Sequence, residues 1–552
     1  MRSGLFLASA LTLLAPATLR AADPPIVYQT QPVGRMLNDT RAAVRLIGGD
    51  KAVQGFNNLL RKRLGEKGFD GLDLNRPIVG YVSIPANPAD WVAVVALPVT
   101  GEKEFLDLCE RANGSKPKPL GKGLFELPPL SPELKAACRV VNGHAYIATA
   151  TKDPAPALDP TAVVPANRLF DPTEQSLFAG HMYFDRLPPG AREKALELLA
   201  GAKGLGLPGG PEELGEVSKK VFEELSKLGK RYIELSKDAK EAAVRLSLDI
   251  RTGDVSVEAT LSAMPGSPLE KIIANKKPTA NKFGALITPD TAVGFKTRLP
   301  LFNDELRNSA VIGLEELRKN IPVGGSPTGK DALDELFKGL IRTVKTGEVD
   351  IVGVVHGPNK KGLYTAVVVV AFEDPSALEK AFKKFVDAEA PPDFKKGLTW
   401  DAAKAGSVNI HTIKFGENDI FIRELRNAFG DDMAIAFAFA PHGIFVTLGQ
   451  DPVAVMKDAL AVKPGPSPVL DVVINPNRLA KFAGAVGGDE GRAEIMRAFG
   501  TDDKLLSAMS LTVEGGKELK VRFTVSLKLF PRDALTSTLD VPADKDPPPL
   551  KK

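Results

Sequence analysis

The chain has 552 residues, 43% of them hydrophobic and 25% charged, which is an ordinary globular composition and enough for about three or four average domains or two large ones. Its 72 basic and 68 acidic residues leave a net charge of +4, which is near balance, so we infer no nucleic-acid-binding surface, since that function needs a concentrated basic face. A core of this size folds without a disulfide or a metal ion.

The N-terminus has the pattern of a secretory signal peptide. Arg2 gives a basic start, residues 5–14 form an apolar run, and a cleavage position follows near Ala21 or Ala22. An anchor or a buried helix is the alternative, but the run is too short to cross a bilayer, and no later run reaches the roughly 18 residues of a membrane helix. We predict that residues 1–22 are removed and that the mature chain is exported, periplasmic, in the cell envelope or extracellular, without a transmembrane span.

Units of one strand followed by one helix recur along the chain in a fixed order. Apolar runs of strand length precede amphipathic stretches with helical spacing. The matching units are residues 27–49 and 293–316, residues 90–112 and 364–385, and residues 181–199 and 470–486. Residues 115–123, "SKPKPLGKG", have the composition of a loop.

Predicted hairpins complete each half of the chain. Residues 244–250 and 255–261 alternate apolar with polar side chains around the turn "RTGD", and residues 509–513 and 519–529 do so around "EGGK". Such alternation indicates strands with one buried and one wet face, as in antiparallel sheets. After the first hairpin, Ser267 predicts the N-cap of a short helix.

The shared order of these units predicts a tandem duplication, with halves at residues 24–277 and 278–540. Residues 143–154 and 441–452 match at a hairpin corner and at the Asp-Pro pair that should start the next helix. The alternative is that any α+β chain shows strand–helix echoes. We predict an α+β fold in which each half is an antiparallel sheet covered by helices, and a disordered tail at residues 541–552.

The first half also contains a predicted helix over residues 212–242. Apolar residues from Leu214 to Leu235 step by three and four, and the other face carries mixed charges. Two interpretations remain: a helix lying on a sheet, which we favour, or a coiled-coil contact with an envelope protein partner. A membrane-surface helix fits less well because the polar face is not mainly basic.

The two cysteines, Cys109 and Cys138, are candidates for a disulfide in an oxidising compartment. The alternative is a pair of free buried thiols. Two cysteines alone cannot make a zinc site.

The sequence contains segments that resemble cofactor-binding motifs, but each departs from its motif at a residue or in its position along the chain. Residues 324–331 resemble a phosphate loop, but Asp331 stands where a magnesium-binding hydroxyl belongs. Residues 204–209 spell a dinucleotide pattern but follow a helix, and the five histidines lack metal-ligand spacing. We therefore assign no catalytic, cofactor or metal residue, and we expect no cofactor.

One pair of residues is kept as a candidate site. If equivalent hairpin corners converge, His144 and His442 would bind a ligand or sense pH. The alternative is two turn residues exposed to solvent.

Residues 68–84, 91–109 and 140–154, together with the leader, resemble a loose group of uncharacterised exported bacterial proteins with repeated hairpin–helix units. The resemblance implies the same architecture over most of the mature chain. The group has no known active site, so the resemblance implies no catalytic residue.

The favoured function is a non-catalytic binding or structural protein of the cell envelope. An exported hydrolase without a recognisable motif is one alternative. A carrier of an apolar ligand is another, suggested by the apolar runs at residues 366–372 and 433–440, although buried strands are the favoured explanation of these runs. A broad exposed apolar patch would favour a protein partner, and an apolar cavity would favour a carrier.

Overall fold

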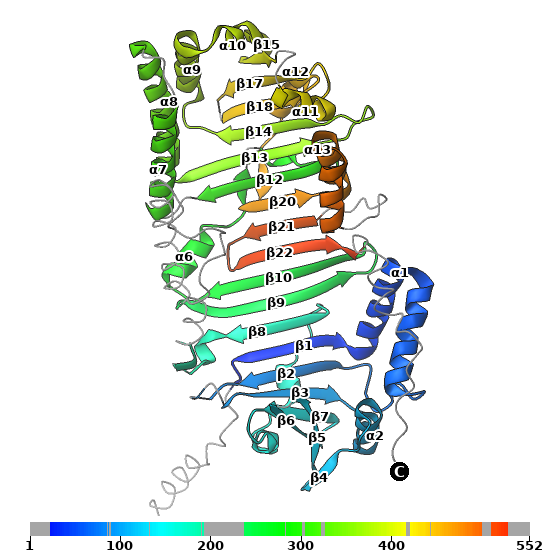
Figure 1. Ribbon diagram of the computed structural model, residues 1–552. Helices are drawn as coiled ribbons and strands as arrows, with labels where there is room; N and C mark the ends of the chain where they lie inside the picture. The colour runs from blue at the N-terminus through cyan, green and yellow to red at the C-terminus, as the bar shows by residue number, and fades with distance from the viewer. Residues whose placement is uncertain are drawn as a thin grey trace, which may run out of the picture. The chain divides into compact units, whose positions relative to one another are not determined.

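The structure is a computed structural model that describes residues 23–85, 87, 90–131, 133–188, 190–192, 237–281, 283–300, 304–321, 326–415, 420–441, 443–499 and 509–527. Helices alternate with antiparallel strands, so the α+β class is confirmed (Figure 1). The chain divides into two compact units. Unit 1 comprises Met1–Glu197, Lys240–Arg251 and Arg532–Lys552, and unit 2 comprises Leu198–Ala239 and Thr252–Pro531. The predicted signal peptide and the C-terminal tail lie outside the described residues.

The strands of unit 1 pair antiparallel in the order β9–β8–β1–β2–β3–β7–β6–β5–β4. Their bounds are β1 (Ile26–Pro32), β2 (Pro77–Ser83), β3 (Val92–Pro98), β4 (Lys118–Gly121), β5 (Leu124–Ser131), β6 (Leu134–Val141), β7 (His144–Ala150), β8 (Phe178–Tyr183) and β9 (Ala239–Asp249). The helices are α1 (Val33–Leu64), α2 (Glu102–Asn113), η2 (Ala155–Leu158), α3 (Ala166–Leu169) and η3 (Phe184–Arg186).

Alternate residues of β6 enter two different cores of unit 1. Ala137 packs in a cluster with Tyr81 and Tyr146, whereas Cys138 packs on the other face with Phe105 and Cys109 of α2. This is the period of two expected for a sheet that buries side chains on both faces.

The strands of unit 2 pair antiparallel in the order β10–β22–β21–β20–β12–β13–β14–β18–β17–β16–β15. Their bounds are β10 (Asp254–Ala263), β12 (Thr291–Pro300), β13 (Glu348–His356), β14 (Thr365–Ala371), β15 (Leu398–Ala405), β16 (Val408–Lys414), β17 (Ala434–Ala440), β18 (Gly443–Gly449), β20 (Leu470–Ile474), β21 (Met509–Glu514) and β22 (Leu519–Ser526). A separate ribbon joins β11 (Thr279–Asn281) to β19 (Gly465–Ser467).

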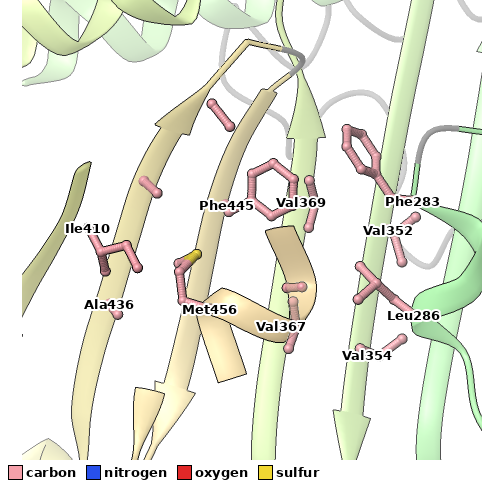
Figure 2. Packing of buried hydrophobic residues seen from close by; sticks show 13 residues of the cluster. Phe283, Leu286, Val352, Val354, Val367, Val369, Ile410, Ala436, Phe445 and Met456 are labelled. Carbon is pink, nitrogen blue, oxygen red and sulfur yellow. The ribbon is translucent and has the colours of Figure 1, made fainter. Parts of the chain in front are cut away.

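The helices of unit 2 are α6 (Pro268–Ala274), η5 (Gly284–Leu286), α7 (Asp304–Asn320), α8 (Pro327–Lys345), α9 (Pro375–Glu389), α10 (Pro392–Gly397), α11 (Ile420–Phe429), α12 (Pro452–Leu460) and α13 (Pro476–Phe499). Helix α12 packs on β14, β17 and β18. Its Met456 is fully buried between Ile410, Ala436 and Val367 in the largest apolar cluster (Figure 2). This cluster fills one face of the sheet from β13 to β16.

The strands predicted from period-two alternation are confirmed. Strands β10, β21 and β22 cover the predicted residues up to Ser526, β9 ends at Asp249, one residue before the predicted end, and β21 pairs with β22 as the predicted hairpin. The corner at residues 142–143 is an Asn-Gly pair with positive φ at both positions, as a tight two-residue hairpin requires.

The predicted helix caps are confirmed where the structure describes them. The Ser267 hydroxyl accepts the Glu270 N–H of α6, and the Asp451 carboxylate accepts the Ala454 N–H of α12. In the first half no α-helix directly follows the Asp-Pro pair: the Asp153 carboxylate accepts the Ala155 N–H at the start of a short 3-10 turn, η2, whose N-cap is Pro154.

Two local predictions are wrong. The prediction of helix up to Ala242 is wrong at its C-terminal end, because β9 begins at Ala239 and pairs with β8. The remainder of that prediction, residues 212–236, lies outside the described residues. The loop predicted at residues 115–123 contains β4, a four-residue strand with every side chain exposed. Strand pairing overrides local composition in both places, and Pro119 is tolerated because β4 is a sheet edge.

An aromatic ring lies over a glycine of the adjacent strand in each unit. Tyr28 of β1 covers Gly80 of β2, and Phe295 of β12 covers Gly353 of β13, in directly opposed register. A Cβ at either glycine would collide with the ring. At Gly80 it would also lie 2.7 Å from the backbone oxygen of Val94, which cannot move aside.

We expect Gly80→Ala to destabilise unit 1 by about 2–3 kcal/mol and Gly353→Ala to destabilise unit 2 less, because the exposed Phe295 ring can swing away. Gly180→Ala is the matched control, since its Cβ would meet Phe178 at an ordinary 3.4 Å. Calorimetric unfolding of the variants measures the difference. Equal losses for all three would contradict the steric explanation.

Candidate functional site

His144 begins β7 and is buried, with 8% of its surface exposed. Its Nε2 lies 2.8 Å from a guanidinium nitrogen of Arg76, whose other terminal nitrogen donates to the Gly143 carbonyl at 3.3 Å. Burial first, and the Arg76 charge second, lower the pKa of His144. The solvent-exposed alternative is therefore wrong for His144. His442 lies outside the described residues, so the ligand or pH-sensing role of the pair stays a prediction.

Cys109 and Cys138 are free, buried thiols in this structure, in one apolar cluster between α2 and β6. Burial raises the pKa of Cys109 to about 11 and that of Cys138 to about 12. The structure thus shows the two cysteines as free buried thiols, and the oxidation of Cys109 and Cys138 to a disulfide stays a prediction.

Residues that the sequence did not single out form a polar centre around one buried histidine in unit 2. It joins His411 of β16, Asp401 of β15 and the α9 pair Glu379 and Lys383. His411 is fully buried, and three aromatic rings lie around it: Trp400 at 4.9 Å, Phe437 at 5.0 Å and Phe439 at 6.4 Å between ring centroids.

A bulge in β15 positions this centre. Between the pairs Thr399–Thr412 and Ala403–Ile410, three residues of β15 oppose His411 alone. Asp401 adopts a φ of 53° there, which is rare for a residue other than glycine. Its backbone N–H consequently points at His411 and donates to Nδ1 at 3.0 Å.

One ammonium and two carboxylates of the centre lie within a short range of one another. The Lys383 ammonium lies 2.7 Å from the Glu379 carboxylate, 3.9 Å from that of Asp401 and 5.1 Å from the centre of the Trp400 ring. Burial first, and then the Lys383 charge, lower the pKa of His411, while the two carboxylates oppose this shift. His411 is therefore a neutral imidazole at neutral pH.

The donor atoms of Glu379, Asp401 and His411 lie within 4.8 Å of one another, which is close enough for a shared metal ion. Two contacts argue against a metal ion at this position. Because Nδ1 accepts a backbone N–H, the proton of the neutral ring is on Nε2, which lies 3.2 Å from Glu379 without hydrogen-bond geometry. Lys383 already supplies the positive charge beside Glu379. The centre is best described as an ion-pair network that fastens α9 to the β15 bulge.

An exposed apolar strip crosses the same face of the sheet as His411. Its residues stand directly opposite one another on adjacent strands. On β13 the residue at this position is Gly353, which has no side chain and is covered by the ring of Phe295. The apolar strip consists of Val257, Phe523, Leu511, Val472, Phe295 and Val368. Phe295 and Val368 are each 42% exposed, Val257 is 40% exposed and Phe523 is 37% exposed.

The opposite face is polar over β10 and β22 and at the centre of β20 and β12, whereas over β13 and β14 it is the main apolar core. Arg522 pairs with Glu258, and Lys296 pairs with Asp471 at 3.1 Å. A sheet with one wet face normally turns its polar side to water and buries the apolar side. Here the apolar side also meets water in the part of the chain that the structure describes, which marks it as a surface for contact.

Comparison with known proteins adds little. No protein-family model matches the chain, and no curated protein matches it. Among solved structures, crystal forms IV, III and I of TP0453 match with 8%, 8% and 9% identity and TM-scores of 0.24, 0.25 and 0.23. These matches cover 49%, 48% and 48% of this chain and 87%, 88% and 87% of that chain. At such TM-scores the likeness carries no argument.

Protonation of His411 should destabilise unit 2 in acid. Because its folded-state pKa is lowered, the unfolded chain binds the proton first, and stability falls as pH drops below about 6.5, by at most about 1.4 kcal/mol per pH unit. His411→Gln should remove this part of the loss. Denaturant unfolding of the variant and of wild type at about pH 7.5 and pH 5.5 measures the difference. Burial also lowers the pKa of His356, which both proteins contain, so its contribution cancels in the comparison. An unchanged acid loss in the variant would refute the assignment.

The two thiols should resist alkylation. With pKa values of about 11 and 12, they should react at pH 8 at least about 100-fold more slowly in the folded than in the unfolded protein. Iodoacetamide labelling followed by intact mass measures this. A mass lower by two hydrogens in the untreated protein would instead establish the disulfide.

Proposed function

We propose that this chain is an exported, non-catalytic binding protein of the cell envelope, and that the apolar strip of unit 2 docks the apolar face of a helix of a partner protein. The apolar strip carries the proposal, because contiguous exposed apolar surface of this kind marks an interaction site. No helix in the described residues is long and apolar enough to cross a membrane.

A helical partner is favoured by what covers the same face elsewhere. Over β17, helix α9 lays its Phe382 ring 5.8 Å from Phe437 and 6.2 Å from Phe439. In unit 1, α2 covers β6 with Phe105 and Cys109. Amphipathic helices are thus the element that this chain already uses to cover such a face.

Unit 1 has a comparable exposed apolar surface on β8 and β9. Phe178 stacks on Tyr28 at 6.3 Å and is 38% exposed, and Val244 is 46% exposed. This recurrence supports a binding role built into the repeated sheet, because isolated exposed apolar residues would not recur at matching strands.

We also propose that the chain arose by tandem duplication. The order β9–β8–β1–β2–β3–β7–β6–β5–β4 corresponds strand for strand to β21–β20–β12–β13–β14–β18–β17–β16–β15. Matching strands also carry the Tyr28–Gly80 and Phe295–Gly353 pairs. These likenesses support the repeat, while the boundary at residues 277 and 278 stays a prediction.

Export rests on residues 1–22 and on the resemblance to uncharacterised exported bacterial proteins, both of which remain proposals. The hydrolase alternative has less support. The one hydrogen bond to His411 in the described chain comes from the Asp401 backbone and not from a hydroxyl or thiol nucleophile.

Site-specific photo-crosslinking in the native envelope tests the binding surface. A photoreactive residue at Val257 should give a discrete adduct with one protein, and at the adjacent Ser256, on the opposite face, it should not. Phe523→Lys should abolish the Val257 adduct with a Tm change of only a few degrees, because Phe523 is partly exposed.

Three results would overturn the helical-partner proposal: equal adducts from both positions, no adduct at all, or a crosslink to this chain itself. The mass of the adduct identifies the last case. A crosslink within the chain or to a second copy would show that this protein covers its own strip.

A further inference from the structure

A second surface of unit 2 is a cavity of about 360 Å³. It lies where the turns of the β15–β16 and β17–β18 hairpins meet the C-terminal end of α12. Its lining is formed by Phe283, Ala405, Val408, Phe445, Lys457 and Ala461, together with neighbouring small and apolar residues.

The floor of the cavity is part of the main core. Phe283 and Phe445 meet edge to face at 5.4 Å, and both are nearly fully buried. In unit 1, the chain after β7 fills the corresponding core face with its own apolar residues, among them Leu158 and Val164. In unit 2 the segment after β18 is α12, which contributes Met456 and Ala459 to the matching core face, and the cavity lies beside the end of this helix.

One charged side chain lines the cavity. Lys457 of α12 carries an ammonium group that forms no ion pair in the described part of the chain. Apolar walls with a single well-placed cation are typical of sites for an apolar ligand that ends in an anion. At roughly 30 Å³ for each heavy atom, the volume holds a chain of about a dozen atoms.

We propose that this cavity binds a linear apolar chain with a carboxylate end, the chemistry of a medium-chain fatty acid, with its tail against Phe283 and Phe445 and its carboxylate at Lys457. The site is separate from the apolar strip, which lies on the other face of the sheet. Binding here therefore does not depend on the partner proposed above.

Isothermal titration of the mature protein with dodecanoate tests the site. We expect one molecule bound, about tenfold weaker binding in Lys457→Met, and no binding in Ala461→Trp, whose ring fills the mouth of the cavity. Lys404→Met is the matched control, because Lys404 precedes Ala405 on β15 but points to the other face. It should bind as wild type does.

Two further ligands isolate the role of the charge. Dodecanol should bind more weakly than dodecanoate and equally well to wild type and Lys457→Met, and dodecyltrimethylammonium should bind least. Absence of dodecanoate binding, equal affinity in Ala461→Trp, or preference for the cation would each overturn the proposal. Phe295→Lys separates the two surfaces: if it alone abolishes binding, the ligand occupies the apolar strip and the cavity is not its site.

Discussion

The register of β12 against its two neighbours is the constraint on which unit 2 depends. Phe295 stands opposite Gly353 of β13 on one side and Val472 of β20 on the other. One residue along, Lys296 forms its ion pair with Asp471 on the reverse face. Because side chains alternate with a period of two, a slip by one residue would put the lysine over the glycine and the phenyl ring on the charged face. Steric fit on one face and charge pairing on the other thus enforce the same register.

The same arrangement recurs at the edge of unit 2. Val257 opposes Phe523 on the apolar face, and the adjacent residues Glu258 and Arg522 form an ion pair on the polar face. Both pairings join segments far apart in the chain, so their loops must close before the contacts form, and folding of this sheet should be slow. The ion pairs satisfy the polar face in water, so it needs no cover. Exposure of the apolar face to water does not stabilise the protein. That these side chains are nevertheless exposed is the reason to assign a partner to this face.

Local pattern predicts much of this fold and almost none of the polar centre. The alternation at residues 244–261 and 509–526 was sufficient to predict the four strands, since alternate side chains of one strand show which of its faces is buried. Ser267 and Asp451 were sufficient for two helix starts, since a cap depends on neighbours three residues away. The helix predicted through Ala242 was wrong because pairing of Ala242 with Met182 outweighs the helical preference of the residues before it.

The polar centre was hidden for a geometric reason. Glu379, Asp401 and His411 lie on a helix and two strands, so no spacing rule connects them. Their meeting depends on the positive φ of Asp401 inside the β15 bulge, which no residue type signals. The one usable sign was His411 itself, which follows the apolar Ile410 in an alternating strand and therefore must face some surface of the sheet. Which surface, and what covers it, follows only from the docking of α9.

The placement of Lys457 limits what the cavity can select. It lies in the last turn of α12, where the backbone carbonyls carry partial negative charge and attract an ammonium group. A bound carboxylate must compete with those carbonyls and lies close to them, so the charge contributes less than it would at a helix N-terminus. Burial of the apolar tail must then supply most of the affinity, at about 25 cal/mol for each Å² removed from water. The expected selectivity follows: chain length decides how tightly a ligand binds, and Lys457 decides which end faces out.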